Sequence, residues 1–239
     1  SLGVPADVAR TTLSFPYNDP GPVCERLKEG DVAAVILEPV TGNMGVIAPE
    51  PGFLEALRET CTETGTVLIF DEVMTGFRLS WQSSQGLYGV EPDMTCLGKV
   101  IGGGMPVGAY GGRSDIMNVV SPLGGVYQAG TLSGNPISVA AGLATLKALQ
   151  EPGFYEQIND STTYLAEGLR EAARETGIDV TVNQVGSMFT LFFGAHEVRD
   201  MDGTASCDHE QFAQFFHGMR NRGVNLPPSQ YEACFVSIA

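Results

Sequence analysis

The feature that most constrains the fold is a pair of short apolar segments that each end on charged residues. The segment 66–70 is followed by Asp71 and Glu72, and the segment 94–98 is followed by Lys99. Short apolar segments bounded by turn residues are typical of strands buried in a parallel sheet. Ligands of open α/β sheets bind beyond the carboxyl ends of such strands. The sequence therefore predicts a carboxylate and an amine at one edge of one sheet.

A carboxylate and a lysine amine in this arrangement suit pyridoxal phosphate. The aldehyde of this cofactor forms a Schiff base with a lysine, and its ring nitrogen needs an acid that keeps it protonated. Strand alternation puts Asp71 and Val73 on one face and Glu72 on the other, so Asp71 can pair with the ring nitrogen while Val73 lies against the ring. A loop acid and a surface lysine are the alternative interpretation. Among the three lysines, however, only Lys99 follows a predicted strand and precedes a glycine turn.

Two further loops carry polar groups that suit a ligand. The predicted strand 32–37 is followed by a loop whose Asn43 can hydrogen-bond a ligand at the same sheet edge, although a plain turn explains it equally well. Asn135 and Pro136 predict the amino end of a helix over 137–149. The loop before that helix offers a hydroxyl group and backbone amides suited to a phosphate, and a plain capped helix is the alternative.

The order of the predicted elements indicates the fold class. The segment 52–63 has its apolar residues on one helical face and lies between two predicted strands, which makes a βαβ crossover. We therefore expect an α/β fold with a mostly parallel sheet and helices on both faces. The break at 151–153 predicts a boundary between a large domain, 1–150, and a smaller α+β domain, 151–239. In the smaller domain we expect a helix over 154–176 and two strands over 180–183 and 187–193. A polar loop over 195–207, a helix over 208–222 and a last strand over 235–238 should follow.

Composition narrows the possible partners. The net charge of −15 argues against nucleic acid or an anionic membrane as a partner. No apolar segment approaches the ~20 residues that a membrane helix needs, and no leader is evident, so we expect a cytoplasmic protein. The five scattered cysteines and three unclustered histidines indicate no metal site. The first residue is not methionine and the chain ends on the largely apolar segment 235–239, which suggests a piece of a longer protein.

Three motifs carry a resemblance to a known family. They are the segments 71–78, 97–99 and 102–112, which read DEVMTGFR, LGK and GGGMPVGAYGG. They resemble the class III aminotransferases, which have the fold type I of pyridoxal-phosphate enzymes, and the resemblance extends over essentially the whole chain. Within that family, the segment 127–136 resembles the aminomutase branch, which isomerises glutamate-1-semialdehyde to 5-aminolevulinate for tetrapyrrole synthesis.

The resemblance implies a role for each matched residue. Lys99 would bind the cofactor covalently, with Asp71 at the ring nitrogen and Val73 over a ring face. Asn43 would lie near the cofactor, and Thr131 would bind the phosphate of the neighbouring subunit's cofactor, which implies a homodimer with shared active sites. Two further residues match positions that line the family's active site and would contact the substrate, Tyr127 and Glu232.

The implied reaction moves an amino group within one substrate. The pyridoxamine form of the cofactor would give its nitrogen to the aldehyde carbon, and Lys99 would move protons as general acid and base. Two alternatives remain open. The first is an omega-aminotransferase of class III, which needs an external amino donor. The second is a truncated and inactive piece of the fold, because the family's amino-terminal glycine-serine phosphate loop is absent from the sequence.

Overall fold

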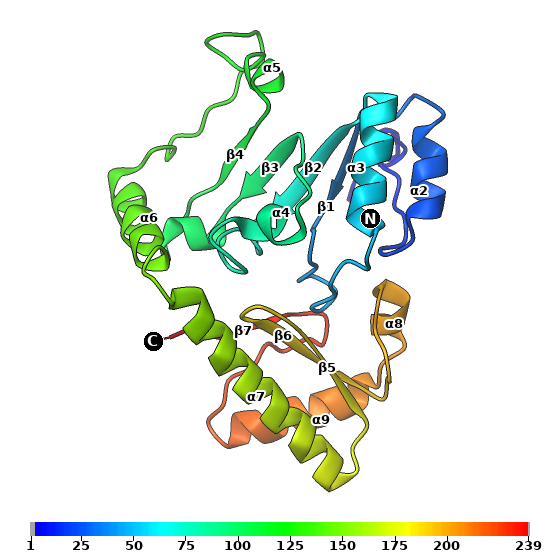
Figure 1. The fold of residues 1–239 in the computed structure, drawn as a ribbon, viewed down its shortest axis with the longest axis vertical. Coiled ribbons are helices and arrows are strands. Elements are labelled where there is room, and N and C mark those ends of the chain that lie inside the picture. The colour runs from blue at the N-terminus through cyan, green and yellow to red at the C-terminus, as the bar shows by residue number, and fades with distance from the viewer. Residues whose placement is uncertain (1–2, 239) are drawn as a thin grey trace.

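The larger of two sheets holds the predicted cofactor strands. The structure is a computed structural model that describes residues 3–238. Within this range the larger sheet has the order β1-β2-β3-β4 (Figure 1), and its strands are β1 (Ala34–Leu37), β2 (Val67–Glu72), β3 (Met94–Leu97) and β4 (Ala109–Gly112). The first three strands run parallel, whereas β4 is antiparallel to β3. The predicted α/β class with a mostly parallel sheet is confirmed.

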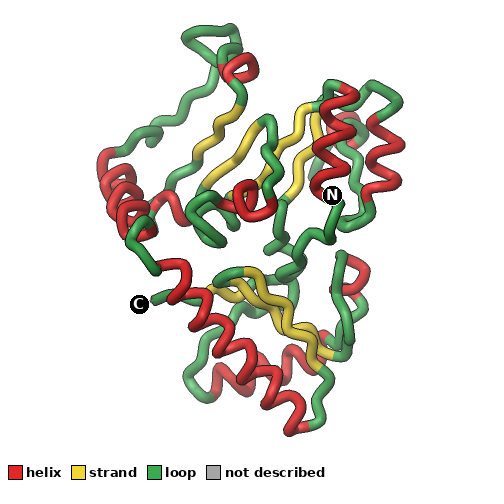
Figure 2. Tube along the Cα trace, in the orientation of Figure 1, coloured by secondary structure: helices red, strands yellow, loops and turns green. Residues whose placement is uncertain are grey.

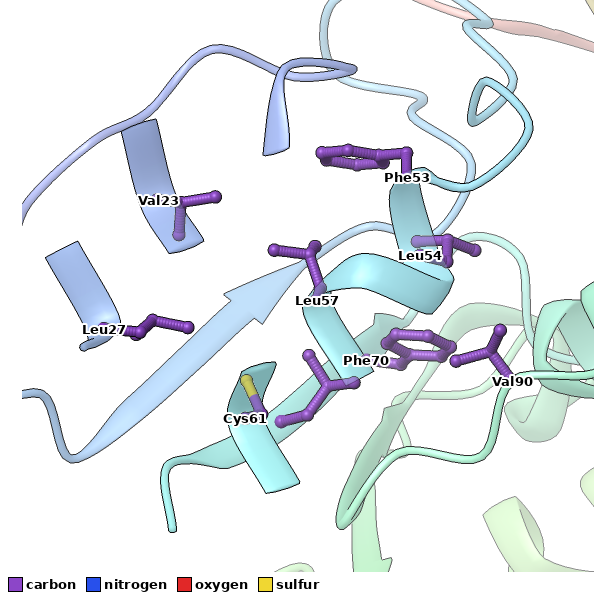
Figure 3. Close-up of a cluster of buried hydrophobic side chains, with 9 residues drawn as sticks. Val23, Leu27, Phe53, Leu54, Leu57, Cys61, Phe70 and Val90 are labelled. Carbon is purple, nitrogen blue, oxygen red and sulfur yellow. The ribbon is translucent and has the colours of Figure 1, made fainter. Parts of the chain in front are cut away.

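Helices α2 (Pro20–Leu27) and α3 (Phe53–Thr64) pack together beside β1 and β2 (Figure 1). The helix predicted over 52–63 is therefore present as α3, and Gly65 ends it with a φ of 72°. Leu57 of α3 and Phe70 of β2 belong to one buried cluster with Val23 of α2 (Figure 3). Burying a side chain of this size contributes about 1.5–3 kcal/mol, so this cluster holds β2 firmly in place.

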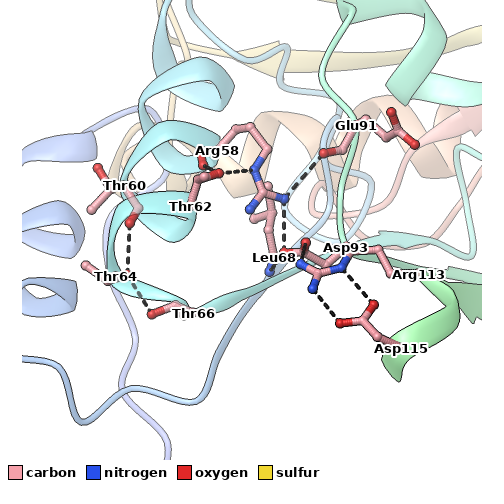
Figure 4. A network of polar contacts seen from close by, with 10 residues as sticks. All are labelled: Arg58, Thr60, Thr62, Thr64, Thr66, Leu68, Glu91, Asp93, Arg113 and Asp115. Carbon is pink, nitrogen blue, oxygen red and sulfur yellow. Dashed lines mark hydrogen bonds and ion pairs between the residues drawn. The ribbon is translucent and has the colours of Figure 1, made fainter. Parts of the chain in front are cut away.

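A polar network stabilises the opposite end of the strands from the predicted site. Asp93, which directly precedes β3, accepts a hydrogen bond from the Leu68 N–H at 2.7 Å. Its carboxylate also forms ion pairs with Arg58 of α3 at 3.0 Å and with Arg113 at 2.8 Å (Figure 4). Burial raises the pKa of Asp93, but these hydrogen bonds outweigh it and hold the pKa below its ordinary value. The network joins a helix and two strands through one carboxylate.

A long loop and a projecting helix follow β4. Figure 2 shows the loop that leads from α5 (Ser114–Met117) to α6 (Pro136–Leu149). The predicted amino end of α6 is confirmed, because the Oδ1 of Asn135 accepts hydrogen bonds from Ile137 N–H at 3.0 Å and Ser138 N–H at 3.3 Å. The other helical segments of this part are short, namely α1 (Ala6–Ala9), α4 (Ser83–Tyr88) and the 3-10 helix η1 (Lys99–Gly102).

The remainder of the chain forms the smaller, antiparallel sheet with the order β5-β6-β7. Its elements are α7 (Phe154–Thr176), β5 (Val180–Val185), β6 (Met188–Phe193), α8 (Met201–Ala205), α9 (His209–Asn221) and β7 (Cys234–Phe235). Every residue of β6 is buried, between helices α7 and α9 and the larger part of the molecule. The division into two domains at residue 150 stays a prediction.

Two expectations for this region are wrong. The segment 195–207, expected as a polar loop, contains the short helix α8, because Asp200 caps it by accepting a hydrogen bond from the Gly203 N–H at 2.7 Å. The last strand, expected over 235–238, is β7, which pairs with β6 over only two residues. Val236 still donates to the Ser187 carbonyl at 3.0 Å, whereas Ile238 is exposed.

No helix in the range 3–238 combines the length and the hydropathy that crossing a membrane requires. The same range contains no group of three or more histidine, cysteine, aspartate or glutamate residues arranged to hold a metal ion.

Candidate active site

The register of the larger sheet brings the predicted site residues to one edge. Leu37 of β1 pairs with Phe70 of β2, so Glu38 and Asp71 follow side by side. Asp71 in turn pairs with Cys96 of β3, three residues before Lys99. The carboxyl ends of the three parallel strands therefore present Glu38, Asp71 and Lys99 together, which is the arrangement expected for a ligand site.

Alternation along β2 separates its two terminal acids, as predicted. Leu68 and Phe70 are buried together with Glu72, whereas Asp71 is partly exposed. The Oδ1 of Asp71 accepts a hydrogen bond from the Val73 N–H at 3.0 Å. This contact fixes the direction of the Asp71 carboxylate, which remains partly exposed at the carboxyl end of β2.

The carboxylate of Glu72 is the site's main structural support, and sequence reasoning assigned it no role. Glu72 is fully buried, and it accepts hydrogen bonds from the Thr75 hydroxyl at 2.9 Å and the Ser84 N–H at 2.8 Å. Gln85 adds its backbone N–H at 3.2 Å and its side-chain amide at 3.4 Å. Glu72 therefore fastens the loop after β2 to the strand that carries Asp71. The available signal was the alternation itself, which sends this acid toward the core.

Lys99 occupies a backbone conformation that is rare for a residue with a side chain. It begins η1 with a φ of 45°, in the left-handed region, and its side chain is exposed. Such residues persist only where the surroundings enforce them, and they cluster at functional sites. The preceding Gly98 lies so close to Val73 that a Cβ atom on Gly98 would be 3.1 Å from the Val73 Cγ1. Val73 therefore packs against the strand end that carries Lys99.

Asn43 lies at the same edge and contacts Glu38. Its Nδ2 donates to the Glu38 Oε1 at 3.1 Å. Burial raises the pKa of Glu38, the hydrogen bonds from Gly42 and Asn43 oppose that rise, and the charge of Asp71 adds to it. The influence of Asp71 on this pKa reflects how close the two carboxylates are. Asn43, Glu38 and Asp71 thus form one polar cluster.

The loop that carries Asn43 is held by the smaller sheet. The Val46 N–H donates to the Thr190 hydroxyl of β6 at 3.0 Å, and the Gly45 N–H donates to the Tyr231 carbonyl at 2.8 Å. Glu232 follows Tyr231 and is exposed. The segment of Glu232 therefore lies against the loop of Asn43, although 189 positions separate the two residues in the sequence.

Two predicted residues lie apart from this cluster within one copy of the chain. Tyr127 is 83% exposed and Thr131 is also exposed, both in the long loop between α5 and α6 (Figure 2). Among residues 3–238, no hydrogen bond or ion pair joins either of them to Asp71 or Lys99. A single copy of the chain thus assembles Asp71, Val73, Lys99 and Asn43 but leaves the side chains of the long loop in solvent.

The chain is similar to known proteins over its whole length. The family model described as aminotransferase class-III matches residues 22–237. A glutamate-1-semialdehyde 2,1-aminomutase from Citrifermentans bemidjiense is 52% identical over 241 aligned residues, which cover all of this chain and 56% of that protein. An enzyme of the same name from Desulfitobacterium hafniense is 56% identical, again over all of this chain and 56% of that protein. The chain therefore spans a little more than half the length of these curated relatives.

Solved structures share the fold. An omega-transaminase from Sphaerobacter thermophilus superposes with a TM-score of 0.90 at 31% identity, over 99% of this chain and 55% of that one. A glutamate-1-semialdehyde-aminomutase from Pseudomonas aeruginosa, in complex with PMP, superposes with a TM-score of 0.85 at 28% identity, over 98% of this chain and 54% of that one. With a family model that matches most of its length, the chain belongs to the class III aminotransferase family.

Proposed function

We propose that this chain forms part of a glutamate-1-semialdehyde 2,1-aminomutase, which converts glutamate-1-semialdehyde to 5-aminolevulinate in the cytoplasm as a step toward tetrapyrroles. The observation that carries the proposal is the placement of Asp71 and Lys99 at the carboxyl ends of two neighbouring parallel strands. The relatives with 52–56% identity over the whole chain support this substrate over others of the family.

The residues present fit pyridoxal phosphate and its pyridoxamine form. The fit rests on the donor set, which is an amine beside a fixed carboxylate, and on the strained backbone of Lys99. When bound, the cofactor supplies an electron-withdrawing ring and a carbon that carries amino groups. Asp71 would keep the ring nitrogen protonated, and Val73 would lie against the ring. Asn43 would bind beside the cofactor.

Lys99 would hold the cofactor through its Nζ and move protons at the same atom as general acid and base. Its exposed side chain leaves that atom accessible at the sheet edge that also carries Asp71. Glu232 would contact the substrate from the segment beside the Asn43 loop, whose backbone is fixed by the Gly45–Tyr231 hydrogen bond. Each proton transfer of the isomerisation would then occur at a residue of the same sheet edge.

A homodimer would complete the site. The long loop and α6 expose large apolar side chains, and such surfaces mark protein interfaces. The most exposed of them are Leu123, Val126, Leu132, Ile137 and Val139. Thr131 lies within this surface, so a second copy packed against it would receive Thr131 near its own cofactor phosphate and Tyr127 near its substrate.

The experiment compares product formation by the purified protein from glutamate-1-semialdehyde alone with product formation after addition of a keto acid. An aminomutase needs no added donor or acceptor. The alternative hypothesis is an omega-aminotransferase, and the TM-score of 0.90 to such an enzyme supports it. This hypothesis predicts product only when a co-substrate is added. No cofactor uptake and no product would identify the chain as an inactive piece.

Borohydride reduction in the presence of pyridoxal phosphate, followed by peptide mapping, tests the cofactor residue directly. We expect the label on Lys99. A label on Lys28 or Lys147 would overturn the assignment, because the chain has only these three lysines.

A further inference from the structure

Helix α6 rests on the short helix that carries Lys99, and it does so through one narrow face. Its buried residues are Ser138, Gly142 and Leu149, four and seven positions apart, which places them on one side of a helix. Most of its apolar side chains, by contrast, are exposed. The contact with η1 is among the most extensive that α6 makes within the chain. The buried face of α6 therefore serves mainly to pack this helix against η1.

This packing depends on the absence of side chains at two glycines. A Cβ atom on Gly142 would overlap the carbonyl oxygen of Ile101, in the middle of η1. From the other side, a Cβ atom on Gly103 would come within 2.5 Å of the Ala141 carbonyl oxygen and of the Thr145 hydroxyl oxygen. A glycine inside a helix costs about 1 kcal/mol relative to alanine, so its presence calls for a packing reason. Here the reason is direct contact between the backbones of α6 and η1.

This contact acts on a strained residue. The φ of 45° at Lys99 costs on the order of 1–3 kcal/mol for such a conformation and persists only under external support. Inside η1, the Ile101 N–H donates to the Gly98 carbonyl at 3.2 Å and the Gly103 N–H donates to the Val100 carbonyl at 3.0 Å. Gly142 meets this turn at Ile101, two residues after Lys99.

We propose that Gly142 is a positioning residue for Lys99: its lack of a side chain lets α6 hold η1 in the one conformation that directs the lysine toward Asp71. Gly142 itself touches neither substrate nor cofactor. The consequence for catalysis rests on the proposed function, whereas the effect on the place and reactivity of Lys99 does not.

The chain offers a matched control. Gly168 lies inside α7, and a Cβ atom there would meet no other atom within 4 Å. Gly142→Ala and Gly168→Ala therefore make the same chemical change inside a helix, with and without a backbone neighbour. Gly168→Ala should raise the unfolding midpoint slightly through helix propensity, and circular dichroism shows whether Gly142→Ala keeps the fold.

The first readout needs no cofactor. Brief acetylation with acetic anhydride, read by mass spectrometry, compares the labelling rate of Lys99 with that of Lys28 as an internal reference. In Gly142→Ala we expect this ratio to change by about threefold or more, because displacements near 1 Å alter the reactivity of a positioned group strongly. In Gly168→Ala it should equal that of the wild type. Equal ratios in both variants would overturn the proposal.

The second readout uses bound pyridoxal phosphate. The pH midpoint of its absorbance change and the rate of borohydride trapping on Lys99 should shift in Gly142→Ala and stay unchanged in Gly168→Ala. If Gly142→Ala does not fold, Thr145→Ala replaces it, because this variant loosens the same contact without an overlap and should shift the labelling ratio in a milder way. A wild-type chain that takes up no cofactor would count against the proposed function, while the labelling experiment would still decide the role of Gly142.

Discussion

Backbone strain at single residues is concentrated around the proposed site. Of the four residues other than glycine with positive φ in the range 3–238, three lie between the end of β2 and the turn after β3, namely Phe77, Ser83 and Lys99, and the fourth is Asn18. Each such residue costs free energy that its neighbours offset. The backbone next to Asp71 is thus held in place by the fold, and it is ready before any ligand arrives.

Asp71→Asn tests the partly exposed acid at the carboxyl end of β2. The amide keeps the size of the side chain but cannot keep a ring nitrogen protonated, so we expect aminomutase turnover to fall by about 10²–10⁴-fold with little change in the unfolding midpoint. Steady-state kinetics and thermal unfolding measure the two effects. Asp160→Asn, at an exposed position of α7, serves as the control. Unchanged turnover in Asp71→Asn would remove Asp71 from the site.

Glu72→Gln tests the buried acid next to it. The glutamine amide presents two donors where Glu72 accepts only, so the hydrogen bonds from Thr75, Ser84 and Gln85 cannot all be kept. We expect a loss of roughly 1–3 kcal/mol in the free energy of unfolding, measured with urea. The exposed Glu63→Gln should leave it within about 0.5 kcal/mol. A stable Glu72→Gln would contradict the supporting role.

At the scale of elements, each end of the larger sheet has its own function. The carboxyl ends of the strands carry the proposed site, whereas the Asp93 network ties the opposite ends to α3 and β4 (Figure 4). Stability and ligand binding can therefore be altered separately by mutation.

The Asp93 network predicts a pH dependence of stability. The pKa of Asp93 is lower in the folded chain than in the unfolded chain, so the ionised carboxylate stabilises the fold. Its contribution to the free energy of unfolding is fully present above the unfolded pKa of about 3.9, and it is lost as the pH falls through the lower folded pKa. Urea unfolding between about pH 2.5 and pH 7 measures this. Below pH 4 the free energy of unfolding should fall less steeply in Asp93→Asn than in the wild type. If the free energies of unfolding of the two proteins changed with pH in parallel, Asp93 would not be the source of the pH dependence.

Helix α6 depends on its cap. Asn135→Ala removes the acceptor for two backbone N–H groups, and we expect the free energy of unfolding to fall by about 1 kcal/mol. Asn135→Asp keeps a capping oxygen and should stay close to the wild type. Urea unfolding of the three proteins decides, and equal losses in both variants would show that the cap does not act through its oxygen.

At the scale of the whole molecule, the exposed apolar loop predicts association. Leu123 is 79% exposed, so a charge there leaves the monomer intact but disrupts a dimer that buries it. We expect Leu123→Asp to shift the sedimentation coefficient from that of a dimer toward that of a monomer. Tyr164→Asp, at an 83% exposed position of α7, should not shift it. A wild-type protein that sediments as a monomer would refute the dimer.

The two sheets are joined by contacts that neither could make alone. Arg78 follows β2 and donates through its Nη1 to the Val236 carbonyl at 3.1 Å, next to β7. The loop of Asn43 is likewise anchored on Thr190 of β6. The smaller sheet therefore shapes the site, even though the proposed cofactor residues lie on the larger part. Limited proteolysis at 151–153 would show whether the predicted domain boundary exists.

The sequence by itself determined the three parallel strands of the larger sheet, the opposite faces of Asp71 and Glu72, and the place of Lys99 after a strand. These features follow from alternation and turn residues within a few positions of one another, which is information that a short segment carries. The cap at Asn135 was predictable for the same reason.

Only the tertiary structure decided how these parts are supported. The donors to Glu72 come from Thr75 and from the start of α4, 3 to 13 positions away. The Asn43 loop rests on residues beyond position 187, and Gly142 meets η1 across 41 positions. The brevity of β7 was missed because its pairing partner, β6, is distant in the sequence. The short helix α8 was missed although its cap at Asp200 is local, because the segment 195–207 was expected as a polar loop. Periodicity involves residues that are close in the sequence, so a short segment reveals it. Close packing depends on which distant parts of the backbone come into contact, and only the folded structure shows that.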